Sequence, residues 1–341
     1  MKILFIGGTG TISSEVVILA KEKGYEVTLL NRGISSSASQ VEGMELITAD
    51  IHDEERVSEL LKGREFDVVA QFIGFTADDV RRDIRLFSGK TKQYIYISSA
   101  SAYQKPLSDY VIRESTTLFN PYWSYSRNKI AAEEVLMNEY RNNNFPVTIV
   151  RPSHTYNGKR AVVAIHGANG SWQTLKRIIE GKKVIIPGDG TSLWTLTHSK
   201  DFAKAFVGLM LNLHAKGEVF NITSDESMTW NQIYQTISET LNLPLKVLHV
   251  SSDFLANHSD NYDFRGELLG DKSNTVVFDN SKIKRVVPDF LCKVSMSEGI
   301  RQSVEYMLAH PETQIEDKEF DLWCDKIISA IEAADNCFRE L

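Results

Sequence analysis

The sequence predicts an α/β protein built on a doubly wound parallel sheet, with a smaller C-terminal lobe. Three observations support this prediction. Short apolar runs recur through the first 150 residues with helical patterns between them, a glycine-rich turn follows the first run, and the regularity fades after Arg151-Pro152. Apolar runs that alternate with amphipathic helices are typical of a parallel sheet that helices cover on both faces.

The apolar runs of the first half are predicted strands. They are Lys2–Ile6, Glu26–Leu30, Met44–Thr48, Asp67–Phe72, Gln93–Ile97 and Pro146–Val150. Between the first two runs, residues 13–23 carry Val16, Val17, Leu19 and Ala20 at helical spacing, and Gly24 follows as a helix stop. The chain from Met1 to about Leu30 is therefore predicted to be a βαβ unit.

The turn Gly7-Gly8-Thr9-Gly10 lies between the first strand and the first helix. Gly7 and Gly10 lack side chains, so the backbone can turn tightly and approach a pyrophosphate at the helix N-terminus. Ser13 occupies the position where a small residue allows close packing of helix on strand. We therefore predict a Rossmann-type dinucleotide site in which Gly7, Gly10, Thr11 and Ile12 hold the pyrophosphate.

The rest of the chain is predicted to form a substrate lobe and a returning segment. Helices are expected at Ser171–Glu180, Ser199–Asn212 and Thr229–Leu241, a strand at Glu218–Thr223, a loop at Ser35–Gln40 and an amphipathic terminal helix at Asp317–Leu341. The predicted dinucleotide-binding domain is 1–152, with 195–224 returning to it. The predicted substrate lobe and C-terminal helix are 153–194 and 225–341.

Composition excludes several classes of protein. A net charge of -7 over 341 residues argues against a general nucleic-acid or acidic-membrane surface. No apolar stretch approaches the ~18 residues that cross a bilayer, and the first run is too short for a secretory signal. Three widely spaced cysteines without CxxC or Cys/His metal spacing favour a reduced, cytoplasmic compartment and no metal site.

The ends of the second and third strands indicate which dinucleotide is bound. Asn31 and Arg32 stand where a carboxylate usually holds the adenosine ribose of NAD. Asn31 would not repel a 2′-phosphate and Arg32 could pair with it, so NADP is favoured and NAD stays possible, unless Arg32 is a solvated loop charge. Asp50-Ile51 suits the adenine amino group, although Asp50 could equally cap a helix that begins near His52.

Tyr125 and Lys129 are the predicted catalytic pair. Four residues apart on a helix, they lie on one face, and the ammonium is expected to lower the pKa of the phenol and to lie near the nicotinamide ribose. Tyr125 could then take a proton from a substrate hydroxyl while a hydride leaves the same carbon. Ser99, just after the strand Gln93–Ile97, is predicted to hydrogen-bond the reacting oxygen.

With these features the chain resembles the extended short-chain dehydrogenase/reductase superfamily, specifically its NAD(P)-dependent epimerase/dehydratase family, over nearly its whole length. Other matching positions are Tyr103, Arg151-Pro152 with Tyr156, Gly188-Asp189-Gly190, His198 with Asp201, and Asp279 with Lys282. The resemblance implies a Rossmann domain whose small C-terminal lobe closes over a substrate, often a nucleotide-linked sugar. It also implies a homodimer.

Some positions differ from the family pattern. His154 stands where nucleotide-sugar members commonly have an asparagine, and Trp194 where many have a phosphate-binding arginine. Candidate substrate contacts are Ser101, His154, Trp194 and Arg265, with packing as the alternative for His154 and Trp194. The stretches Asn31-Arg32-Gly33 and Leu196–His198 resemble the atypical branch that contains chloroplast stem-loop RNA-binding proteins.

The predicted function is that of a sugar-modifying enzyme, oxidoreductase or isomerase in type. An epimerase is preferred, acting through transient oxidation of a sugar hydroxyl by Tyr125 and the bound cofactor. Ala100 and Ser101 follow Ser99 where a dehydratase would need an acid/base pair, so a dehydratase is less favoured. A net NADP-dependent reductase or dehydrogenase, or a non-catalytic dinucleotide-sensing or RNA-binding protein, stays open.

Overall fold

The chain forms two compact units. The computed structural model describes residues 1–33, 43–259 and 261–340, so the predicted loop Ser35–Gln40 lies outside the described residues. Unit 1 comprises Met1–Thr155, Leu196–Asp225 and Phe278–Lys293. Unit 2 comprises Tyr156–Thr195, Glu226–Val277 and Val294–Leu341.

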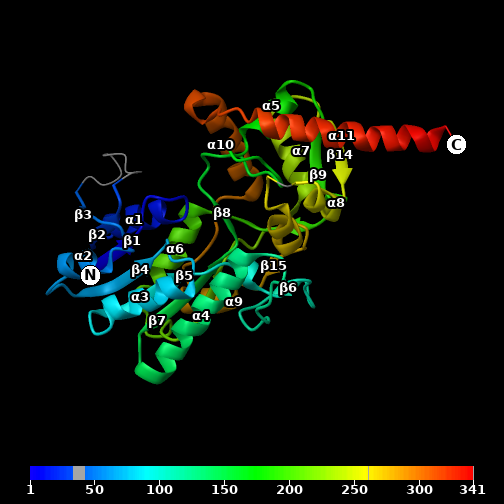
Figure 1. Ribbon diagram of the computed structural model, residues 1–341. Helices are drawn as coiled ribbons and strands as arrows, with labels where there is room; N and C mark the ends of the chain where they lie inside the picture. Colours follow the sequence, from blue (N-terminus) through cyan, green and yellow to red (C-terminus); the bar gives the residue numbers. More distant parts are fainter. Residues whose placement is uncertain (34–42, 260, 341) are drawn as a thin grey trace. The chain divides into compact units, whose positions relative to one another are not determined.

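A parallel sheet forms the centre of unit 1. Within the described residues it has seven strands in the order β12-β7-β5-β4-β1-β2-β3 (Figure 1). These are β1 (Lys2–Ile6), β2 (Glu26–Asn31), β3 (Glu45–Thr48), β4 (Phe66–Gln71), β5 (Thr91–Ile97), β7 (Val147–Pro152) and β12 (Val219–Ile222). The chain begins in the middle of the sheet, moves outward to β3 and returns beside β1 as β4, which is the doubly wound Rossmann order that the sequence predicts.

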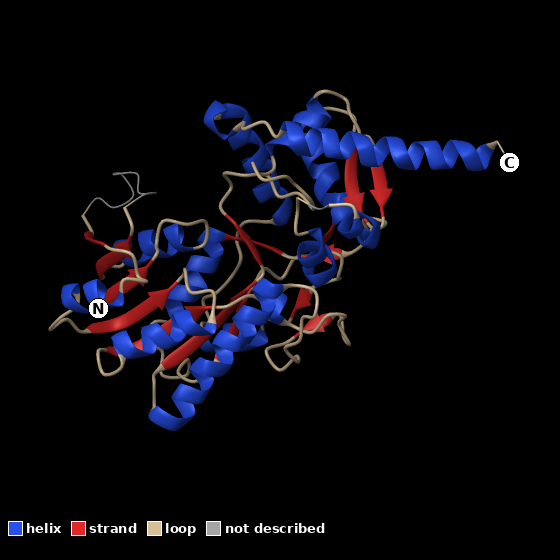
Figure 2. Cartoon of the chain, in the orientation of Figure 1, coloured by secondary structure: helices blue, strands red, loops and turns tan. Residues whose placement is uncertain are grey.

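Helices cover both faces of this sheet (Figure 2). On one face lie α1 (Ser13–Glu22), α6 (Ser199–Leu209) and α9 (Ser281–Val286), and on the other α2 (Glu54–Leu60), α3 (Ala77–Phe87) and α4 (Ser124–Asn143). Within β1, Ile3 and Phe5 join the first core while Leu4 and Ile6 join the second. Every inner residue of β1 is thus buried, which explains its unbroken apolar run.

The segment Phe278–Lys293 belongs to unit 1, whereas we expected it in the substrate lobe. Its attachment is specific. The Thr223 hydroxyl donates to Asn280 Oδ1 at 2.8 Å, Asn280 Nδ2 donates to the Thr223 carbonyl at 3.0 Å, and Ile283 is fully buried in the core beside α6. These contacts join residues about 60 positions apart in the sequence, so no local sequence pattern predicts them.

Short elements complete unit 1 and its connections to unit 2. They are η2 (Ala100–Ala102), β6 (Val111–Ile112), β8 (His154–Tyr156), β11 (Leu196–His198) and β15 (Val277–Phe278).

Unit 2 combines helices with short strands. Its elements are α5 (Trp172–Ile179), β9 (Val184–Pro187), β10 (Leu193–Trp194), β13 (Met228–Thr229), α7 (Trp230–Leu241), β14 (Val247–Val250), α8 (Ser252–Asn257), the π-helix η3 (Arg265–Lys272), α10 (Met296–Ala309), η4 (Pro311–Thr313) and α11 (Lys318–Arg339). The terminal helix α11 buries Phe320, Ile327 and Ile328 on one face, as predicted for an amphipathic helix. The buried Arg177 of α5 donates to Asp321 and Asp325, which ties α11 to α5.

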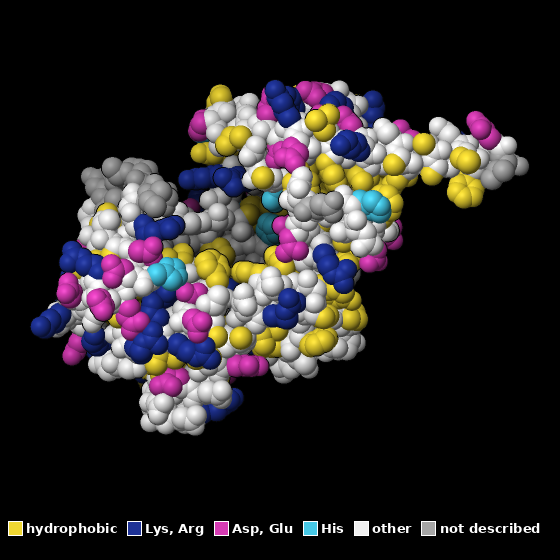
Figure 3. Space-filling model, in the orientation of Figure 1, with side chains coloured by type: hydrophobic (Ala, Val, Ile, Leu, Met, Phe, Trp, Pro, Cys, Tyr) yellow, Lys and Arg dark blue, Asp and Glu magenta, His cyan; other side chains and the backbone are white. Residues whose placement is uncertain are grey.

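Charges of both signs are interspersed on the part of unit 1 that Figure 3 shows. Over the described ranges, no helix is both long and apolar enough to span a membrane. The same residues hold no cluster of three or more His, Cys, Asp or Glu side chains that could bind a metal ion.

Candidate functional site

The glycine turn between β1 and α1 has a backbone that favours glycine. Gly7 and Gly8 have φ of +95° and +106°, a conformation that L side chains rarely adopt. A Cβ on Gly7 would lie 3.1 Å from Ile73 Cγ2, and one on Gly8 would lie 3.0 Å from Leu29 Cδ2. The predicted residues Gly7, Gly10, Thr11 and Ile12 line one cavity of 510 Å³ together with Ser13, whose hydroxyl accepts the Gly10 N–H at 3.0 Å.

A second cavity, of 320 Å³, continues from Gly7 toward the ends of β2 and β3. Its lining includes all four residues that the sequence predicts for the adenosine end of the cofactor, which are Asn31, Arg32, Asp50 and Ile51. Its other lining residues are Thr9, Leu30, Ala49, His52, Ile73 and Phe75. The carboxyl ends of neighbouring parallel strands meet at one edge of the sheet, which is why side chains about 20 residues apart converge here.

A hydrogen bond to the Asn31 side-chain oxygen fixes the orientation of its amide group. Its Oδ1 accepts the Gly33 N–H at 2.8 Å. Its Nδ2 is buried and has no hydrogen-bond partner among the described residues. A buried donor without a partner is costly, so this nitrogen is suited to a ligand oxygen.

Asp50 does not cap the helix that follows it, so that alternative was wrong. The N-cap of α2 is Asp53, whose carboxylate accepts the Arg56 N–H at 3.1 Å. Asp50 Oδ1 instead accepts the backbone N–H of His52 at 3.0 Å and contacts His52 Nδ1 at 2.8 Å. The His52 N–H, then its ring, lowers the pKa of Asp50, which keeps the carboxylate ionised at the pocket.

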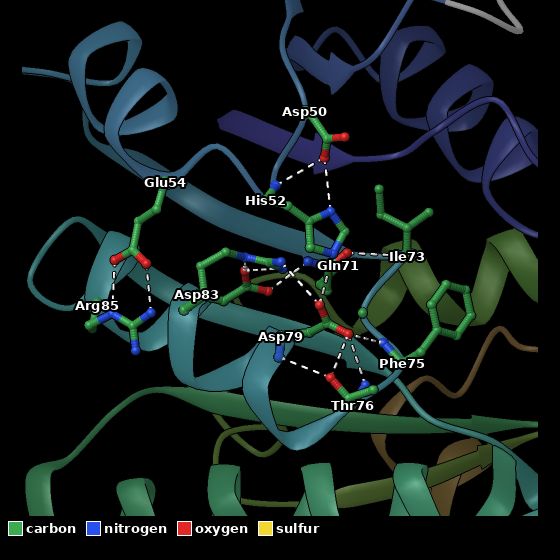
Figure 4. Close-up of polar contacts among 12 residues, drawn as sticks. Asp50, His52, Glu54, Gln71, Ile73, Phe75, Thr76, Asp79, Asp83 and Arg85 are labelled. Carbon is green, nitrogen blue, oxygen red and sulfur yellow. Dashed lines mark hydrogen bonds and ion pairs between the residues drawn. The ribbon is translucent and has the colours of Figure 1, made fainter. Parts of the chain in front are cut away.

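Asp79 at the start of α3 organises the turn on the opposite side of this pocket (Figure 4). Its Oδ2 accepts the Phe75 N–H, the Thr76 N–H and the Thr76 hydroxyl, each at 2.9 Å. Burial alone would raise the pKa of Asp79, but these hydrogen bonds outweigh it and lower the pKa to about 2. Asp79 is therefore ionised and holds Phe75 at the wall of the cavity.

Lys129 lies on α4, one helical turn after Tyr125, and its ammonium contacts the edge of the sheet where the parallel strands end. Its side chain is buried, and Nζ donates to the carbonyls of Gly74 and Ile97 at 2.7 Å each. Nζ also lies 4.9 Å from the ring centre of Phe75, 4.8 Å from that of Tyr96 and 5.8 Å from that of Tyr125. Burial lowers the pKa of Lys129 to about 7, although the charges of Glu133 and Asp79 oppose this shift.

Tyr125 is half-buried between two aromatic neighbours. Its ring centre lies 4.9 Å from that of Trp123 and 6.4 Å from that of Phe75. Because Phe75 also lines the 320 Å³ cavity, an aromatic strip runs from the cavity wall to the Tyr125 ring. The Lys129 ammonium lies against this strip.

Ser99 caps η2 at the end of β5. Its Oγ accepts the Ser101 N–H at 3.2 Å and lies 2.8 Å from Ser101 Oγ, which in turn accepts the Ser126 hydroxyl at 2.8 Å. Ser101 is buried within this chain of hydroxyls. Ser101, which we expect among the substrate contacts, thus links Ser99 to α4, the helix that carries Tyr125 and Lys129.

The other three candidate substrate residues lie apart in the chain. His154 is half-buried in β8 and belongs to unit 1. Trp194 and Arg265 belong to unit 2. There Trp194 stacks on the fully buried Trp230 with ring centres 5.5 Å apart, as expected for a packing residue.

Sequence reasoning missed Gly8, His52 and Phe75. Gly8 was visible in the turn, but its need for positive φ was not. His52 and Phe75 come into the pocket through the strand order and the turn that Asp79 holds, and their only sequence signal was their place four residues after the end of a strand.

These residues fit a nicotinamide dinucleotide. The glycine turn offers backbone to a pyrophosphate at the start of α1, and Asp50 keeps Oδ2 as an acceptor. Asn31 offers a buried donor that has no partner in the described part of the chain. The Lys129 ammonium contacts the end of β5, beyond the glycine turn, where the reactive end of such a ligand would lie.

The lowered pKa of Lys129 predicts a pH-dependent stability. Its folded pKa of about 7 lies below its unfolded value of 10.5, so the unfolded chain binds more protons between these limits and stability rises with pH there. From pH 6 to pH 9 we expect the wild type to gain about 2 kcal/mol of unfolding free energy relative to Lys129→Met. Urea denaturation at each pH measures this.

The surface substitution Lys62→Met, in the turn after α2, is the control and should show a difference from wild type that does not change with pH. A Lys129→Met difference that is equally flat would contradict the burial of this ammonium.

Comparison with known proteins identifies relatives that match most of the chain. 2′-Dehydrokanamycin reductase of Streptomyces kanamyceticus is 22% identical over 290 residues, 85% of this chain and 80% of the relative. Chloroplast stem-loop binding protein of 41 kDa b of Arabidopsis thaliana is 28% identical over 255 residues, 71% of this chain and 64% of the relative.

A solved structure shows the same fold. It is UDP-glucuronic acid 4-epimerase of Bacillus cereus in complex with UDP-glucuronic acid and NAD, with a TM-score of 0.70, 20% identity, and coverage of 91% of this chain and 99% of that chain. The family profile for the NAD dependent epimerase/dehydratase family matches residues 3–223, most of the chain. The resemblance inferred from the sequence is thus confirmed, and the chain belongs to the NAD-dependent epimerase/dehydratase family.

Proposed function

We propose that this chain is an NADP-dependent enzyme that modifies a sugar by transient oxidation of one of its hydroxyl groups, with an epimerase as the first candidate. The observation that carries the proposal is the placement of Lys129. Its Nζ is held by the carbonyls of Gly74 and Ile97 under the rings of Phe75 and Tyr125, at the sheet edge that also carries the glycine turn and Ser99.

The cofactor would be held by the lining of the two cavities. Gly7, Gly10, Thr11 and Ile12 would hold the pyrophosphate, and Asp50 with Ile51 the adenine. Asn31 Nδ2 and the exposed Arg32 would face the adenosine ribose, and because β2 ends in Asn31 and not in a carboxylate, a 2′-phosphate would be accepted there. The same lining accepts NAD without the contacts to a 2′-phosphate, so the proposal is a preference for NADP.

Tyr125 would move the proton. When bound, the nicotinamide supplies a hydride acceptor, and a donor for the reverse step. Tyr125 Oη takes the proton of the substrate hydroxyl as the hydride leaves the carbon that bears it, and returns the proton when the carbonyl is reduced. Ser99 Oγ donates a hydrogen bond to the reacting oxygen. Lys129 stabilises the Tyr125 phenolate and binds the nicotinamide ribose through its remaining N–H.

The neighbours of Ser99 favour an epimerase over a dehydratase. Ala100 has no acid/base group, and the Ser101 hydroxyl is bonded to those of Ser99 and Ser126, so neither is available for a β-elimination. A net reductase is the second candidate, favoured by the likeness to 2′-dehydrokanamycin reductase. The nucleotide that the purified chain releases on denaturation separates the two, because an epimerase recycles its cofactor and a reductase exchanges it.

The likeness to a chloroplast stem-loop binding protein supports a third candidate, a non-catalytic protein. The placement of Ser99, Tyr125 and Lys129 supports catalysis instead. For the substrate we propose a free or nucleotide-linked sugar, and the contacts that the sequence suggests for it stay predictions.

Tyr125→Phe is expected to lower turnover by about 10²- to 10⁴-fold, because it removes only the proton-transferring hydroxyl. Turnover is measured by NMR on a panel of free and nucleotide-linked hexoses incubated with the chain and NADP. NADPH binding, followed by its fluorescence, should change by less than about three-fold because the ring packing is kept. Trp123→Phe keeps Tyr125 Oη and serves as the matched control. Turnover that survives Tyr125→Phe would refute this mechanism.

Asn31→Asp is expected to shift the cofactor preference toward NADH. A carboxylate beside the 2′-phosphate should weaken NADPH binding by about ten-fold or more while sparing NADH. Calorimetric titration with each dinucleotide measures the ratio of the two affinities, and the uncharged Asn31→Ser is the control. An unchanged ratio would show that Asn31 does not face the adenosine ribose.

A further inference from the structure

His52 joins two walls of the 320 Å³ cavity. Nδ1 lies 2.8 Å from Asp50 Oδ1 at the end of β3, and Nε2 lies 3.2 Å from Asp79 Oδ1 on α3 (Figure 4). The His52 side chain is 66% exposed, whereas that of Asp79 is 10% exposed. The imidazole thus bridges a pocket residue and a buried carboxylate that comes from a different strand-helix unit.

The Asp79 end of this bridge leads to the catalytic lysine. Asp79 holds the backbone N–H groups of Phe75 and Thr76, and Gly74 in the same turn accepts a hydrogen bond from Lys129 Nζ. Phe75 lines the cavity and lies over Lys129. A side chain that fixes Asp79 against Asp50 therefore also fixes the turn between the adenosine end and the catalytic end of the site.

The bridge depends on the charge of the ring. A neutral imidazole donates a hydrogen bond from one nitrogen only. The lone pair of its second nitrogen would then point at a carboxylate, which is unfavourable. Both Asp50 and Asp79 have lowered pKa values and are ionised at neutral pH. Only the imidazolium satisfies both contacts, and histidine changes its charge between about pH 5 and 8.

We propose that His52 is a proton-dependent positioning residue, whose imidazolium holds the Asp50 wall and the Phe75 turn in the arrangement that binds the dinucleotide. The inference rests on the proposed dinucleotide site and adds a regulation to it. Loss of the His52 proton releases one wall and removes a positive charge from a pocket for an anionic ligand. Dinucleotide affinity is therefore expected to fall when the imidazolium loses its proton.

Among the described residues, two arginines also act on the carboxylates of the bridge. Arg82 on α3 donates to Asp79 Oδ1 at 3.1 Å, and Arg32 after β2 acts on the Asp50 carboxylate. Both arginines keep their charge over this pH range. Lys129 and the 2′-phosphate of NADP also titrate in it, so the test compares each variant with the wild type at the same pH.

The test measures the Kd of NADPH by fluorescence at several pH values from 6 to 8.5, for the wild type, His52→Ala and His52→Arg. The ratio of variant Kd to wild-type Kd removes the titrations that all three share. For His52→Ala we expect a ratio of about three to ten at pH 6, the size typical of partly exposed ion pairs, falling toward about one at pH 8.5. His52→Arg keeps a charge and two donors, so its ratio should be near one at pH 6 and below one at pH 8.5.

Arg85→Ala is the matched control. Arg85 on α3 makes a two-pronged bond to Glu54 on α2, at 2.8 Å and 2.6 Å, so it joins the same two segments as His52 but lies outside the cavity lining. Its loss should leave NADPH binding unchanged at every pH.

Each outcome of this test either supports the proposal or overturns it. A His52→Ala ratio that declines with pH, with an unchanged Arg85→Ala, supports the proposal. A ratio of one at all pH values shows no role for His52, and a raised ratio that does not vary with pH shows a packing role without a proton, so either overturns it. A wild-type chain that binds neither NADPH nor NADH overturns the proposed function itself, and with it this inference.

Discussion

The site is organised around the two hydrogen bonds that Lys129 Nζ donates to the carbonyls of Gly74 and Ile97. Ile97 ends β5, and Gly74 lies in the turn after β4, so one ammonium joins α4 to the ends of two central strands. An ammonium buried to this degree is costly in a protein interior. Its charge is tolerated because carbonyl oxygens and the faces of three aromatic rings surround it. The position of Tyr125 follows, since it lies one turn earlier on the same helix.

The next residues along α4 strengthen this attachment. Glu133, one turn after Lys129, is buried and accepts hydrogen bonds from Ser98 at the end of β5 and from Arg151 on β7. Arg151 also lies 4.8 Å from the ring centre of Tyr103. A buried ion pair adds little net stability, but removing one partner is strongly destabilising, so the pair fixes where α4 lies. The buried polar contacts that attach α4 to the sheet are thus the same contacts that position the proposed catalytic residues.

The sequence predicted the features that depend on local spacing. The apolar runs from Lys2 to Val150 each contain a strand, with ends that differ by no more than two residues, and the spacing of Tyr125 and Lys129 placed both on one helix. What it did not predict depends on tertiary contacts. The amide of Asn31 is oriented by the Gly33 N–H, and His52 contacts Asp79, which lies on α3. The segment Phe278–Lys293 packs on residues that are far away in the sequence. Asp50 was ambiguous because an aspartate before a helix looks like a cap, and the cap proved to be Asp53.

A crystal structure of the chain with NADP bound tests the central claim most directly, because the claim concerns which residues meet at one ligand. The account predicts the adenosine between Asn31 and Asp50, the pyrophosphate on the turn from Gly7 to Ile12, and the nicotinamide ribose within hydrogen-bonding distance of Lys129 Nζ. A dinucleotide bound elsewhere, or one whose nicotinamide ribose lies out of reach of Lys129, would contradict it.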